Sequence, residues 1–293
     1  NDLMMQGGGD TVYIMIGCSM TSLDLDTWSP RPASRKEFYD YMRVMDALPY
    51  VHIMSAFPMF GFAGVPECML LVESNAAKLR VSSKAQQEGG VLDNHLWNIK
   101  MAQAVGSECM QLANPAAPLT YYENIAQLIL DCCDLDQPFH TASGPVAGAT
   151  GPATLAGSLV TNNAEGMAGI ILAQLYKPGH RVWTGNMSMV QNMCTGSPRF
   201  GAVENVLGEA MFNQVWRSYK IPTWISSGAW CDSKVIDYQA GWEQTMAISL
   251  GLLSGPTCVF YPGSLTAELT AHPYKALMDH DILGQLARFL KGP

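Results

Sequence analysis

Eight short apolar runs with strand-like composition recur along the chain, and helical patterns lie between them. The runs cover residues 11–16, 51–57, 78–83, 108–112, 137–142, 181–185, 222–227 and 257–262. Alternation of strand and helix is typical of parallel β-α units. Eight such units in one chain predict the α/β class, and within it a (β/α)₈ TIM barrel that occupies residues 1–293 as a single domain.

Several helical patterns have an apolar side that we expect to face the core. These sides are Phe38, Tyr41, Met42 and Met45; Ile125, Leu128, Ile129 and Cys132; Leu207, Met211 and Val215; Trp242, Met246, Leu250 and Leu253; and Met278, Ile282, Leu286 and Leu290. A helix expected over 155–176 contains three glycines, which predict close packing on the barrel. An open doubly wound sheet is the alternative fold, but Gly7-Gly8-Gly9 lacks its Gly-x-Gly-x-x-Gly pattern.

The composition of the chain limits the classes of function and partner that it can have. The net charge of −8 argues against a nucleic-acid partner, because phosphate binding needs a basic face. No apolar run approaches the roughly 20 residues of a membrane span, so no membrane association is expected. The eight cysteines include no CxxC pair, which favours the reduced cytosol. With only 14% charged residues and 18 methionines, the chain is also expected to form a homo-oligomer.

The segment after the seventh run places an unusual set of side chains before a helical pattern that begins near Asp237. It contains Trp230, Cys231, Asp232 and Lys234. Barrel enzymes carry their chemistry at the carboxyl ends of the strands, so this loop is the first candidate for a site.

Long ordered blocks of sequence resemble one family. The blocks are Gly228-Ala-Trp-Cys-Asp-Ser-Lys234 with Asp237-Tyr-Gln-Ala-Gly-Trp-Glu243, Leu155 to Glu165 with Gly169 to Leu175, Thr195-Gly-Ser-Pro-Arg-Phe-Gly201 with Glu204, and Leu269-Thr-Ala ahead of Asp279. Together they are similar to the trimethylamine methyltransferase family of corrinoid-dependent enzymes, from about Gly9 to Gly292. Family members are longer at both ends, so the chain looks like the barrel without its flanks.

The resemblance implies transfer of a methyl group from a small methylated amine to the Co(I) of a separate, cognate corrinoid protein. The expected cofactor is therefore a corrinoid (cobalamin) carried by that partner, and the chain is expected to bind no cofactor tightly itself. Trimethylamine enzymes of the family have pyrrolysine at the position of Trp230, and tryptophan offers no electrophilic carbon. The chain thus resembles a non-pyrrolysine member of the glycine betaine type, whose quaternary nitrogen needs no activation.

The resemblance makes Trp230 and Asp232 the catalytic candidates, although Asp232 could instead fix its loop. An indole face attracts a quaternary ammonium by about 0.5–2 kcal/mol, and further rings near the expected strand ends could complete a cage. These substrate-binding candidates are Trp183, Trp224, Phe260, Tyr261 and His140. They could equally fill the barrel, because strand residues alternate in direction.

Arg199 is a candidate for binding a substrate carboxylate, or else a solvated charge at the rim. The family tends to have a glutamate in the eighth loop at the position of Thr266, whereas this chain has Glu268 two residues later. No histidine and cysteine spacing matches a zinc site, so no metal is expected.

Two other functions remain open. The chain could be a trimethylamine–corrinoid methyltransferase in which residue 230 is really pyrrolysine. It could also be a barrel that binds quaternary ammonium compounds without catalysis.

Overall fold

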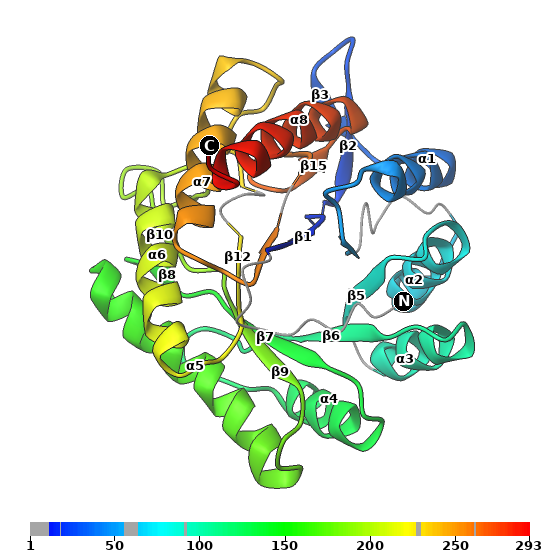
Figure 1. Ribbon diagram of the computed structural model, residues 1–293, viewed down its shortest axis with the longest axis vertical. Helices are drawn as coiled ribbons and strands as arrows, with labels where there is room; N and C mark the ends of the chain where they lie inside the picture. The colour runs from blue at the N-terminus through cyan, green and yellow to red at the C-terminus, as the bar shows by residue number, and fades with distance from the viewer. Residues whose placement is uncertain (1–11, 18, 56–63, 91–92, 227–229, 261) are drawn as a thin grey trace.

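The computed structural model describes residues 12–17, 19–55, 64–90, 93–226, 230–260 and 262–293 (Figure 1). Within these residues eight parallel strands close into a barrel in the order β1-β13-β12-β9-β7-β6-β5-β4. Their bounds are β1 (Tyr13–Met15), β4 (Ile53–Met54), β5 (Ala85–Gly89), β6 (Cys109–Ala113), β7 (Phe139–Ser143), β9 (Val182–Asn186), β12 (Thr223–Ile225) and β13 (Cys258–Phe260). The predicted TIM barrel is confirmed.

Helices surround the barrel as an outer ring (Figure 1). They are α1 (Arg35–Ala47), α2 (Leu70–Val81), α3 (Asn94–Ala104), α4 (Glu123–Asp134), α5 (Leu155–Tyr176), α6 (Val203–Ser218), α7 (Tyr238–Leu253) and α8 (Pro273–Leu290), with a short 3₁₀ turn, η1 (Glu67–Met69), before α2. The apolar sides predicted for α1 and α4 are buried, and α5 has the bounds that the sequence predicts. A Cβ at Gly166 would lie 2.9 Å from Thr184 Oγ1, so a small residue is needed where α5 meets the barrel.

The third strand differs from the prediction. Residues 78–81 of the expected run form the last turn of α2, and the strand is β5, with the polar sequence Ala-Gln-Gln-Glu-Gly. Lys78 of α2 and Glu88 of β5 have fully buried side chains, and their Nζ and Oε1 atoms lie 2.6 Å apart. Because each charge is the partner of the other, a polar segment can form a buried strand here.

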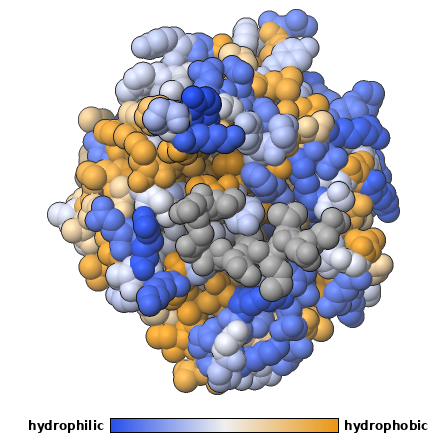
Figure 2. Space-filling model, in the orientation of Figure 1, coloured by the Kyte–Doolittle hydropathy of each residue, from blue (hydrophilic) through white to orange (hydrophobic). Residues whose placement is uncertain are grey.

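Three later helices bury a different side from the one predicted. On α7, Trp242 is 51% and Leu253 is 65% exposed, whereas Glu243 and Gln244 are buried. The inner side of α7 is built from small and polar residues, so the apolar stripe faces outward. The exposed Leu207 of α6 and Met278 of α8 show the same shift. Figure 2 shows apolar side chains gathered on the left of the molecule, over α6 and α7.

Two small sheets extend the loops at the barrel mouth. One consists of β8 (Val146–Ala147), β10 (Met189–Gln191) and β11 (Pro198–Arg199). The other consists of β2 (Thr21–Asp24), β3 (Ser29–Arg31), β14 (Ser264–Leu265) and β15 (Thr270–Ala271). These sheets hold the loops after β9 and β13, which contribute to the site below. In the part of the chain that the structure describes, no helix is long and apolar enough to cross a membrane.

Candidate active site

Four of the predicted ring residues meet inside the barrel. The ring of His140 lies 5.6 Å from that of Trp183 and 5.3 Å from that of Trp224, measured between centroids. Trp224 packs in turn against Phe260, the last residue of β13, at 4.6 Å. A side chain at position 185 would collide with Trp224, so Gly185 is what allows this indole to lie across β9. The strand interiors therefore bring together rings from β7, β9, β12 and β13.

His140 is fully buried, and neither of its ring nitrogens has a hydrogen-bond partner among the described residues. Burial lowers the pKa of His140 to about 3, so the imidazole is neutral near pH 7. The indole nitrogen of Trp224 is also buried without a partner in the described part of the chain. His140 can therefore offer a neutral ring or a hydrogen bond to a guest, but not a positive charge.

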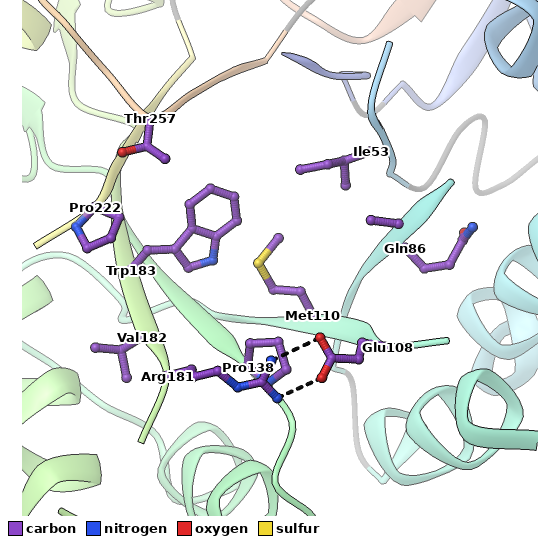
Figure 3. Close-up of a pocket in the computed structure, with 11 residues that line it drawn as sticks. Ile53, Gln86, Glu108, Met110, Pro138, Arg181, Val182, Trp183, Pro222 and Thr257 are labelled. Carbon is purple, nitrogen blue, oxygen red and sulfur yellow. Dashed lines mark hydrogen bonds and ion pairs between the residues drawn. The ribbon is translucent and has the colours of Figure 1, made fainter. Parts of the chain in front are cut away.

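Trp183 lies lower in the barrel than the sequence suggests. It is the second residue of β9, not the last, and it lines a cavity of about 220 Å³ at the amino ends of the strands. In Figure 3 the side chains of Trp183 and Met110 point into this cavity, with the Arg181–Glu108 ion pair beside them. Barrel enzymes work at the opposite, carboxyl end. The expectation of a position at a strand end is wrong for Trp183 and also for His140, which is the second residue of β7 and the register partner of Trp183. The part of either residue in substrate binding is untested.

Trp230 sits in the loop after β12 and is fully buried. Its ring packs against Phe200 in a T-shaped arrangement, with centroids 5.1 Å apart and an interplanar angle of 83°. It belongs to the same buried cluster as Trp183, Trp224 and Phe260. The aromatic surroundings that the sequence predicts for Trp230 are thus present, and in this structure protein atoms cover the indole.

The indole nitrogen of Trp230 donates a hydrogen bond to Glu268 Oε2 at 2.9 Å. Glu268 comes from the loop after β13, 38 residues away. Burial raises the pKa of Glu268 to about 7, and the hydrogen bond from Trp230 partly opposes that shift. Sequence reasoning left Glu268 out of the site, and the only signal was the family's tendency to have a glutamate two residues earlier.

An unusual turn aims Glu268 at Trp230. Thr266, Ala267 and Glu268 all have positive φ angles, of 53°, 57° and 65°. Each non-glycine residue in this left-handed region costs about 1–2 kcal/mol. Two backbone hydrogen bonds hold the turn, from Thr266 N to Ser233 O at 2.8 Å and from Ala267 N to Cys231 O at 2.7 Å. The loops after β12 and β13 are therefore joined through their backbones.

Asp232 connects the Trp230 loop to the loop after β9. Its Oδ2 lies 3.2 Å from Arg199 Nε, and its Oδ1 accepts a hydrogen bond from Phe200 N at 3.0 Å. Asn205 donates to the carbonyl oxygens of Arg199 and Phe200, at 2.6 and 2.9 Å. Asp232 thus holds in place the segment whose ring covers Trp230, and Arg199 lies at the rim with its guanidinium half-exposed.

The carboxylate of Glu243 in α7 supports this loop from below. Its Oε2 accepts a hydrogen bond from Asp232 N at 2.8 Å, and a side chain at position 201 would collide with it. Cys231 is buried, and burial raises the pKa of its thiol, which argues against a nucleophilic role. Among the described residues no three His, Cys, Asp or Glu side chains are grouped to hold a metal ion. Tyr261, another predicted site residue, lies outside the described residues.

The family model of the trimethylamine methyltransferases (MTTB) matches residues 2–293. The chain belongs to the trimethylamine methyltransferase family. A glycine betaine methyltransferase of Desulfitobacterium hafniense (strain Y51) is 36% identical over 184 residues, which cover 62% of this chain and 38% of that protein. A trimethylamine methyltransferase of Methanosarcina barkeri (strain Fusaro) is 34% identical over 178 residues, or 61% of this chain and 36% of the relative.

A third relative covers the whole chain. The trimethylamine methyltransferase of Desulfitobacterium hafniense (strain DCB-2) is 27% identical over 308 aligned positions, which are 60% of its length. The family member described here thus covers between 36% and 60% of the length of these relatives, less than two thirds of each. Among solved structures, the monomethylamine methyltransferase of Methanosarcina barkeri has a TM-score of 0.66 at 10% identity, covering 96% of this chain and 60% of that one. This likeness supports the barrel fold.

Within the family's barrel the predicted site residues fall into three groups. His140, Trp224, Phe260 and Trp230 lie together in the interior. Asp232 and Arg199 pair beside them at the mouth, and Trp183 extends the cluster toward the amino end. Glu268 joins the first group, because its carboxylate contacts Trp230 from the neighbouring loop.

Proposed function

We propose that this barrel transfers a methyl group from a quaternary amine of the glycine betaine type to the reduced cobalt of a corrinoid protein. The observation that carries the proposal is the surroundings of Trp230, the residue at the family's pyrrolysine position. Its indole lies in an aromatic cluster and donates to a carboxylate. Aromatic faces with a nearby carboxylate are the chemistry that recognises a quaternary ammonium, which offers positive charge and no hydrogen-bond donor.

The reaction requires little acid–base chemistry from the chain. The methyl carbon–nitrogen bond breaks with its electron pair remaining on nitrogen, so the leaving amine is neutral. The new carbon–cobalt bond uses the two electrons of Co(I), which becomes formally Co(III), and no proton moves. The neutral His140 and the unreactive Trp230 are compatible with such a reaction, because binding, orientation and exclusion of water are sufficient.

Access to Trp230 requires a local opening. Phe200 packs on the indole, and its backbone is bound to Asp232. We expect the substrate to enter when the segment around Phe200 moves away from the mouth. Asp232 then acts in the proposal by positioning that segment.

The methyl acceptor in this proposal is carried by a separate cognate corrinoid protein that docks at the mouth. A homo-oligomer in the cytosol is part of the same proposal. The exposed apolar side chains of α7, such as Trp242 and Leu253, support an oligomer.

The test is the formation of methylcobalamin from Co(I) cobalamin, followed in the visible spectrum. Glycine betaine should serve as the methyl donor and trimethylamine should not. Methylation from trimethylamine would favour the alternative with pyrrolysine, and the mass of the peptide spanning residue 230 would decide it. Quaternary amine binding without transfer to cobalamin or to the corrinoid protein would favour a non-catalytic barrel.

A further inference from the structure

The hydrogen bond to Trp230 does not by itself explain why a glutamate occupies position 268. A hydroxyl or amide oxygen could accept the indole N–H at 2.9 Å just as well. A carboxylate in this partly buried position must lose much of its hydration. The chain also accepts three successive left-handed residues to bring it there. When this carboxyl is ionised, its negative charge therefore calls for a positive partner.

The pair of Trp230 and Glu268 has the properties of a cation receptor. The indole supplies a π face, and a carboxylate that accepts its N–H increases the electron density of the ring. When it is ionised, the same carboxylate places a negative charge at the edge of that ring, and a bound cation favours that ionised form. Phe200 contributes a second aromatic surface, 5.1 Å from the indole centroid. The backbone bonds to Ser233 and Cys231 fix the distance between the two loops that supply the pair.

We propose that Glu268 is the specificity-determining counter-charge of this site, and that it selects trimethylammonium compounds over molecules of the same shape whose trimethyl group carries no charge. The inference rests on the proposed function for its ligand class. It adds a residue outside the sequence-predicted set and assigns it a role in binding rather than in methyl transfer.

A matched pair of ligands isolates charge from shape. Glycine betaine and tert-butylacetate have the same outline and the same carboxylate, but only the first has a positive nitrogen. Equilibrium binding of both is measured by calorimetry on the full chain. The wild type should bind betaine at least about tenfold more tightly than tert-butylacetate, a ratio that one good charge contact supplies.

Two substitutions separate the charge of Glu268 from its hydrogen bond. Glu268→Gln keeps an oxygen for Trp230 Nε1 and removes the charge, whereas Glu268→Ala removes both. Glu268→Gln should weaken betaine binding about tenfold and change the affinity for tert-butylacetate by no more than about twofold. The preference for betaine over tert-butylacetate is then lost. Glu204→Gln, an exposed change in the first turn of α6, is the control and should alter neither ligand.

Three results would overturn the proposal: unchanged betaine binding in Glu268→Gln, equal losses for both ligands, or no preference for betaine in the wild type. Its failure is distinguishable from failure of the proposed function, because binding needs no corrinoid. Betaine selection that depends on Glu268 without methyl transfer would refute only the proposed function. Methyl transfer from betaine that is indifferent to Glu268→Gln would refute only this inference.

Discussion

Arg199 Nε lies 3.2 Å from Asp232 Oδ2, and this ion pair joins the loop after β9 to the loop that carries Trp230. The two partners differ in exposure, with half of the Arg199 side chain open to solvent and only 13% of that of Asp232. Asp232 also receives the backbone N–H of Phe200. Asp232 therefore has two functions in the structure, whereas the side chain of Arg199 has, among the described residues, one ion pair through Nε and a half-exposed guanidinium.

These two residues should respond differently to substitution. Arg199→Ala should weaken the binding of betaine more than the binding of tetramethylammonium, because only betaine has a carboxylate that the guanidinium can bind. Asp232→Ala should weaken binding of both ligands, since it removes the acceptor of the Phe200 N–H and so releases the segment of Phe200. Binding of both ligands to each variant is the measurement. Equal losses for betaine and tetramethylammonium in Arg199→Ala would sink the carboxylate role of Arg199 and leave it as an anchor of the loop.

Trp230 can be tested by removing its ring in two steps. Trp230→Ala should raise the KM for betaine at least several-fold, since one cation–π contact contributes about 0.5–2 kcal/mol. The KM of Trp230→Phe should lie between those of the wild type and Trp230→Ala, because phenylalanine keeps an aromatic face and lacks the N–H that donates to Glu268. Trp97→Ala changes an exposed indole on α3 and serves as the control. Kinetics of Trp230→Ala that match the wild type would remove this residue from the site.

The buried pair of Lys78 and Glu88 predicts a large effect on stability. Lys78→Met should lower the free energy of unfolding by about 3–5 kcal/mol, because it leaves the carboxylate of Glu88 buried without a cation. Lys100→Met, at an exposed position of α3, should change it little. Urea unfolding of both variants gives the comparison, and adding Glu88→Gln to Lys78→Met should recover part of the loss. A cost below about 1 kcal/mol for Lys78→Met would mean that the pair is hydrated.

The same pair shows why the barrel could be predicted from the sequence while one strand could not. Seven of the eight predicted runs contain or overlap a barrel strand, because their apolar residues meet the requirement of a buried parallel sheet. The third strand is polar, and its charge is neutralised by a lysine ten residues earlier on α2. Hydrophobic periodicity detects apolar residues, so it does not detect a strand that an ion pair stabilises. The inverted side of α7 has a similar cause, since Glu243 is buried to hold the loop of Trp230.

Part of the candidate site could likewise be predicted from the sequence, and part of it could not. Trp230, Asp232 and Phe260 were within reach of sequence reasoning. Phe260 ends β13, Trp230 and Asp232 follow β12, and the family blocks contain the loop of Trp230. Glu268 was not within reach, because its contact with Trp230 spans 38 residues and its turn uses no glycine. A left-handed turn of Thr, Ala and Glu has no signature in composition, since glycine and asparagine usually mark such positions.

Glu268 makes stability depend on pH with a definite sign. Its pKa is about 7 in the folded chain against an ordinary value of 4.5, so between these values the folded state retains a proton that the unfolded state has lost. Its contribution to stability is therefore complete below pH 4.5 and disappears as the pH rises through 7. Glu268→Gln removes this dependence and keeps the acceptor for Trp230. The melting temperature of Glu268→Gln relative to wild type should rise between pH 5 and pH 8, while Glu204→Gln should show no such trend. A difference that stays constant or falls over this range would show that the carboxyl of Glu268 is already ionised at pH 5.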